Sequence, residues 1–126
     1  MFSSGALQAQ GDGMGLSNTQ TIRVTELLDR GFSACAAVET LYRPDCYQQV
    51  YRSAARVLGN NGGYWEAEVA LTRVGRNLYN FVRANIDPKA PKIKADGRRV
   101  KAITKASLPA AGALYQDNAA KAEAIL

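Results

Sequence analysis

The sequence predicts an all-α protein, a small antiparallel bundle of about four helices. Its 126 residues, 47% hydrophobic and 21% charged, are ordinary for one globular domain. Apolar residues recur at spacings of three and four in several segments, and glycine or proline clusters separate these segments. We therefore expect residues 19–126 to form a single helical domain. Residues 1–18 are rich in Gly, Ser and Gln without helical periodicity, and we expect them to form a flexible N-terminal arm.

The first expected helix begins with a cap at residues 17–19 and buries Val24, Leu28 and Cys35. Cys35 and Cys46 cannot complete a four-ligand zinc site, because the chain has no histidine. We expect a disulfide between them, the alternative being two buried thiols. A disulfide needs Cα atoms about 4.4–6.8 Å apart. The first helix should therefore end near residues 38–40, or the first two helices should cross steeply.

The second expected helix starts at Pro44 or Asp45, because proline is tolerated in a first turn. Its apolar side is formed by Tyr47, Val50, Ala54 and Val57. Gly59 ends it, since glycine suits the left-handed position that follows a helix. A turn rich in Gly and Asn then leads to the next helix.

The third expected helix, residues 63–87, has the clearest periodicity in the chain. Its core side is Tyr64, Ala67, Leu71, Val74, Leu78, Phe81 and Val82. The opposite side carries what we call the aromatic–basic stripe: Trp65, Val69, Arg73, Arg76, Tyr79 and Arg83. Indole, phenol and guanidinium groups are enriched in binding hot spots, so the stripe is a candidate partner surface. Alternatively, the arginine stems cover apolar surface while Trp65 and Tyr79 pack under adjacent helices.

The remaining chain is expected to be an extended connection over residues 88–96 and then a helix from about residues 96–98. Pro109 should kink or break this last helix, because it lacks the N–H donor. Seven basic residues and one acid lie between Pro88 and Lys105. Five of them form a candidate anion-binding cluster: Lys92, Lys94, Arg98, Arg99 and Lys101. A solvated loop between helices is the alternative explanation.

The absence of histidine excludes Ser-His-Asp and Cys-His catalysis and every histidine-ligated metal site. The sequence has no phosphate-binding P-loop motif, and its carboxylates are few and scattered. We therefore expect no enzymatic activity, no cofactor and no metal. No run of 18 apolar residues is present, so no membrane-spanning helix is expected.

The preferred functional hypothesis is a non-enzymatic protein-binding or assembly module that contacts a protein partner through the aromatic–basic stripe. A disulfide favours an oxidising compartment, here the periplasm or the exterior. Residues 6–9, Ala-Leu-Gln-Ala, slightly resemble the surroundings of a signal-peptide cleavage site. The alternative is a cytosolic basic protein that binds nucleic acid or an anionic surface through the lysine-rich cluster. A small apolar ligand between the helices and self-association are further open alternatives.

Overall fold

The computed structural model describes residues 18–59 and 65–125, with side chains described for residues 19–59 and 65–120. Its helices are α2 (Asn18–Ala36), α3 (Arg43–Gly59), α4 (Trp65–Asn85) and α5 (Leu108–Ile125). Short 3-10 turns, η1 (Thr40–Tyr42) and η3 (Lys105–Ser107), precede α3 and α5. Strands β1 (Ile93–Ala95) and β2 (Arg98–Val100) form a small antiparallel hairpin. The predicted all-α bundle is confirmed, whereas the predicted arm over residues 1–18 falls almost entirely outside the described residues.

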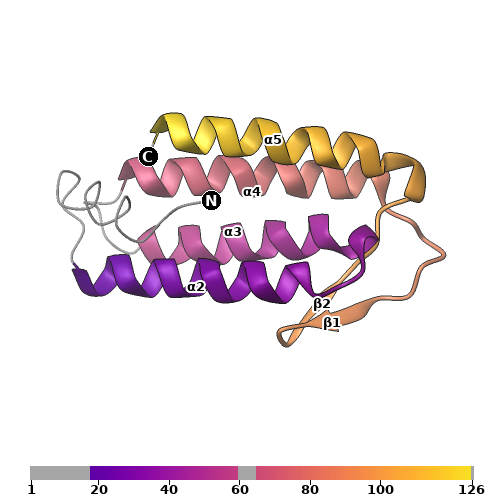
Figure 1. The fold of residues 1–126 in the computed structure, drawn as a ribbon, viewed down its shortest axis with the longest axis horizontal. Helices are drawn as coiled ribbons and strands as arrows, with labels where there is room; N and C mark the ends of the chain where they lie inside the picture. The colour runs from indigo at the N-terminus through magenta and orange to yellow at the C-terminus, as the bar shows by residue number, and fades with distance from the viewer. Residues whose placement is uncertain (1–17, 60–64, 126) are drawn as a thin grey trace.

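The four helices are arranged in chain order. Figure 1 shows them lying along the long axis of the molecule in the order α2, α3, α4, α5. The main contacts are those of α2 with α3, of α3 with α4, and of α4 with α5. Helices α2 and α5 are therefore the edges of the bundle and are not packed against each other.

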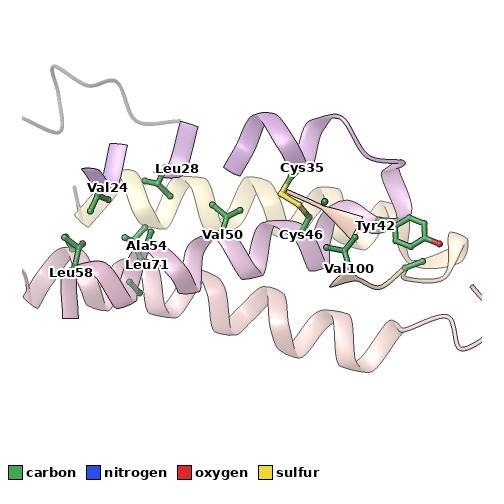
Figure 2. Close-up of a cluster of buried hydrophobic side chains, with 14 residues drawn as sticks. Val24, Leu28, Cys35, Tyr42, Cys46, Val50, Ala54, Leu58, Leu71 and Val100 are labelled. Atoms are coloured by element: carbon green, nitrogen blue, oxygen red, sulfur yellow. A yellow bond between two sulfur atoms is a disulfide. The ribbon is translucent and has the colours of Figure 1, made fainter. Parts of the chain in front are cut away.

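The largest core cluster follows the contact between α2 and α3. Val24, Leu28 and Val50 are each at most 3% exposed, as the helical spacing predicted. Figure 2 shows this cluster extending from Val24 and Leu58 at one end to Tyr42 and Val100 at the other.

The predicted disulfide between Cys35 and Cys46 is present, with Cα atoms 5.5 Å apart. Helix α2 ends at Ala36, slightly before the predicted end, and η1 returns the chain to the start of α3. The Arg43 side chain closes this corner, because its Nε donates to the Val38 carbonyl and its Nη2 to the Ala36 carbonyl, each at 3.0 Å. Basic groups are favourable at the carbonyl end of a helix.

The expectations for residues 88–109 were partly wrong. A helix does not begin at residues 96–98; instead Asp96 and Gly97 form a tight turn with φ values of 51° and 77°. Positive φ at both central residues suits the right-handed twist of a two-residue hairpin, and Asp-Gly is a preferred sequence for it. Helix α5 begins only at Leu108, so Pro109 lies in its first turn and does not interrupt a longer helix.

The hairpin is fixed to the bundle by hydrogen bonds and by burial. The backbone N–H of Lys101 donates to Asp45 Oδ2 at 2.8 Å, and Gln49 Nε2 donates to the Arg99 carbonyl at 2.8 Å. Val100 is fully buried. At the hairpin turn, the Arg30 guanidinium pairs with Asp96 at 2.8 Å and lowers the pKa of that carboxyl. The hairpin thus covers the end of the bundle where the disulfide lies.

Candidate functional site

The outer face of α4 exposes the aromatic–basic stripe. Trp65 is 66% exposed and Tyr79 is 37% exposed, so neither ring is packed under an adjacent helix. Arg73, Arg76 and Arg83 are exposed and Val69 is half-buried. The core side of the helix is formed by Ala67, Leu71, Val74, Leu78 and Val82, with Phe81 half-buried. The predicted core residue Tyr64 lies outside the described residues.

Arg52 of α3 extends the stripe onto a second helix. Its guanidinium carbon lies 5.0 Å from the centre of the Tyr79 ring, and that of Arg83 lies 5.7 Å from the same ring. The approach is close because α4 has a glycine there: a Cβ on Gly75 would lie 2.9 Å from Arg52 Cγ. Arg52 is not part of the stripe predicted from the sequence, because periodicity within α4 cannot show which residue of the neighbouring helix α3 contacts that face.

The guanidinium groups of this face are not neutralised by salt bridges. Within the described residues, no carboxylate lies in salt-bridge distance of Arg52, Arg76 or Arg83. Cation–π contacts orient a guanidinium without cancelling its charge. The face therefore combines ordered positive charge with an exposed indole, which is chemically suited to an acidic and partly apolar protein surface.

The hairpin brings four of the five predicted anion-binding residues together. Lys94 lies directly opposite Arg99 in the strand register, and both are exposed. Lys92 and Lys101, which flank the strands, are exposed as well. Arg98 is separated from them because it pairs with the buried Ala95 and is itself half-buried. Like charges directly opposite each other repel, so this face would gain stability from a bound anion.

A groove that sequence analysis did not predict lies between the two edge helices. We call it the aromatic groove and define it by the rings of Phe32, Tyr47, Tyr51 and Tyr115 together with Val74 and Leu78. Its volume is about 840 Å³. Phe32 lies 5.4 Å from Tyr51, and Tyr47 lies 5.5 Å from Tyr115, between ring centres. The groove exists because α2 and α5 do not meet, and no spacing within a single helix signals that arrangement.

Several polar side chains also line the aromatic groove. Arg43 lines one end, and Asn118 on α5 lines the groove farther along. Asn118 is 3% exposed; its Oδ1 accepts a hydrogen bond from Asn77 at 3.3 Å, whereas its Nδ2 has no partner. Burial raises the pKa of both Tyr51 and Tyr115, so their phenols stay neutral at ordinary pH.

The described residues contain no group of three or more acidic or cysteine side chains that could hold a metal ion. None of the described helices is long and apolar enough to cross a membrane. Comparisons of the chain with protein family models, with curated proteins and with solved structures gave no match.

Proposed function

We propose that the protein is a non-enzymatic protein-binding module whose partner docks on the aromatic–basic stripe together with Arg52. The observation that carries the proposal is the Tyr79 ring, which both Arg52 and Arg83 contact, with the exposed Trp65 on the same helix. Exposed aromatic and arginine side chains are those whose burial contributes most to protein–protein affinity. Because no described carboxylate forms a salt bridge with Arg52, Arg76 or Arg83, the docking surface of the partner should be acidic.

The partner can be trapped by photo-crosslinking in the producing cells. A benzophenone side chain at Arg76 should yield one discrete cross-linked species, whereas the same group at Gln116, exposed on α5, should not. Once that partner is purified, the double variant Trp65→Ala/Arg76→Ala should bind it at least about 30-fold more weakly, since a hot-spot truncation costs about 2 kcal/mol or more.

A matched pair on another helix controls for nonspecific loss of apolar and positive groups. Ile22 is 46% exposed and Arg23 is exposed, both on α2. The variant Ile22→Ala/Arg23→Ala should leave the affinity within about threefold, as most exposed residues outside a hot spot do. Unchanged binding by the Trp65→Ala/Arg76→Ala variant would remove the stripe from the interface.

We also propose an extracytoplasmic location, periplasmic or secreted, because a disulfide between Cys35 and Cys46 persists in oxidising compartments. Alkylation of thiols in intact cells, followed by mass spectrometry, should find both cysteines protected. Recovery of the protein with two alkylated thiols would contradict this location.

A second candidate function is the binding of nucleic acid or an anionic surface by the hairpin. The opposed pair Lys94 and Arg99 favours it, because two exposed like charges face each other. Affinity for duplex DNA or anionic vesicles should fall steeply with added salt. Lys94→Gln/Arg99→Gln should weaken binding more than Lys105→Gln, a basic position outside the hairpin. Salt-independent binding, or none, would dismiss this function.

A further inference from the structure

We propose that the aromatic groove is a binding site for a small amphipathic carboxylate, with the carboxylate at Arg43 and an apolar body along the tyrosine and phenylalanine rings. This site is separate from the aromatic–basic stripe, since it uses Val74 and Leu78 on the buried side of α4. A volume of about 840 Å³ is within the range of sites that enclose a small organic molecule, roughly 300–1,000 Å³.

The length of the groove sets the size of the apolar body. Arg43 lies at the end of the bundle where Leu41, just before it, packs in one cluster with Leu108, the first residue of α5. Asn118 lies ten residues farther along α5, which corresponds to about 15 Å at the rise of an α-helix. The ligand is therefore an extended molecule with a chain of medium length, not a compact metabolite.

Arg43 determines the position of the anionic group. Two of its nitrogens are held by the carbonyls of Val38 and Ala36, so the guanidinium is fixed in orientation. Within the described residues it has no carboxylate partner. Asp29 lines the groove away from this end, because it lies seven residues before the end of α2 at Ala36. A carboxylate is thus attracted at Arg43 and repelled near Asp29.

Asn118 supplies the second polar contact. Its Nδ2 is a buried hydrogen-bond donor with no partner among the described residues, and Asn118 lines the groove. Buried donors without an acceptor are rare in folded proteins and mark places where a group from outside the chain can bind. Because Nδ2 is itself buried, a hydroxyl or carbonyl oxygen at the far end of the ligand would accept this hydrogen bond once the Asn118 carboxamide turns toward the groove.

The test uses the full chain and a fluorescent apolar anion, anilinonaphthalene sulfonate, displaced by dodecanoate, dodecanol or dodecylammonium below their micelle-forming concentrations. Dodecanoate should bind at least about tenfold more tightly than dodecanol, since a charge-assisted contact with Arg43 distinguishes them, and dodecylammonium should be the weakest. Equal affinities for the three head groups would overturn the assignment of the carboxylate to Arg43.

A pair of α5 variants then locates the site. Gly112 lines the groove and a Cβ there would meet no atom within 4 Å, so Gly112→Phe should fold and fill the groove. It should weaken dodecanoate binding by about tenfold or more, since the apolar cavity is occupied. The control Ala113→Phe, one residue away and exposed, should bind as the wild type does. Equal binding by both variants would place the ligand elsewhere.

The same measurements distinguish a bound carboxylate from self-association of the protein through the groove. If the wild type binds none of these probes but forms a dimer that Gly112→Phe dissociates, the groove is a self-association surface and the proposal is wrong. A monomer that binds none of the probes also overturns it. Finally, Arg43→Gln should weaken the binding of dodecanoate and leave the affinity for dodecanol unchanged. If the affinities for dodecanoate and dodecanol fell by the same factor, Arg43 would not contact the head group directly.

Discussion

Glycine-to-alanine substitution should have opposite effects on stability at two helical positions, Gly31 at the contact between α2 and α3 and Gly112 on the exposed face of α5. A Cβ at Gly31 would lie 2.6 Å from both methyl carbons of Val50. Valine has one strongly preferred rotamer in a helix, so these methyl groups cannot rotate away. Overpacking costs about 1–3 kcal/mol, whereas alanine recovers about 1 kcal/mol of helix propensity. Gly31→Ala should therefore lower the free energy of unfolding by up to about 2 kcal/mol.

Gly112 provides the matched comparison, since it is helical, exposed and has no atom within 4 Å of a built Cβ. Gly112→Ala should raise the free energy of unfolding by about 0.5–1 kcal/mol through backbone propensity alone. Val50→Ala alone should cost about 2 kcal/mol, because it removes two buried methyl groups. In the double variant with Gly31→Ala, the new methyl group partly fills that space, so the two effects should couple by about 2 kcal/mol.

Urea denaturation with the disulfide intact, followed by far-ultraviolet circular dichroism, measures all four variants. The slope of the free energy with urea should stay constant, because the surface exposed on unfolding hardly changes. A Gly31→Ala variant that gains stability as Gly112→Ala does would show that α2 and α3 are not in the close contact described. Additive effects of Gly31→Ala and Val50→Ala would show that the two side chains do not meet.

Three further predictions concern the disulfide, the hairpin and alkaline pH. Replacing Cys35 and Cys46 together by alanine should lower the free energy of unfolding by about 3 kcal/mol, since a loop of about 12 residues is no longer closed; an unchanged urea midpoint would contradict this. Asp45→Ala should cost about 2–3 kcal/mol, because the buried Gln48 amide and the partly buried N–H of Lys101 both lose their charged acceptor, and hydrogen exchange of the hairpin amides should accelerate. Burial raises the pKa of Tyr115 above its ordinary value of 10.0, so its contribution to stability is present below pH 10 and is lost as the pH rises further. Tyr115→Phe should therefore lose stability less steeply in urea titrations above pH 10, and equal slopes would refute the assignment.

Local sequence patterns were sufficient to predict the first three described helices and the disulfide. Val24, Leu28 and Leu71 recur at helical spacing, and each is buried as expected. The pairing of Cys35 with Cys46 followed from their spacing and from the short reach of a disulfide, which also required α2 to end early. These predictions depend on neighbours in the chain, which the sequence displays directly.

The hairpin and the groove depend on contacts between distant segments. Asp96-Gly97 is a sequence typical of a hairpin turn. Val100 and Ile103, however, also have the spacing of one side of a helix, and this competing pattern led to the wrong prediction of a helix from residues 96–98. The end of β2 is instead held by Asp45, more than fifty positions earlier in the chain, which accepts the N–H of Lys101 just after the strand. Arg52 joined the stripe only because Gly75 lets α3 and α4 approach closely. No residue in the aromatic groove indicates by its own spacing that α2 and α5 stay apart.

The arrangement of the helices in chain order also bears on how quickly the native state is reached. Each helix packs mainly on the one that precedes or follows it, so most contacts join residues that are close along the polypeptide. Short sequence separation between contacting residues lowers the entropy lost before the first contacts form, and helical proteins of this kind fold in microseconds to milliseconds. The two hydrogen bonds that join α3 to Arg99 of β2 and to Lys101 just after it span at least 50 residues, and their formation is expected to be the slow, late step.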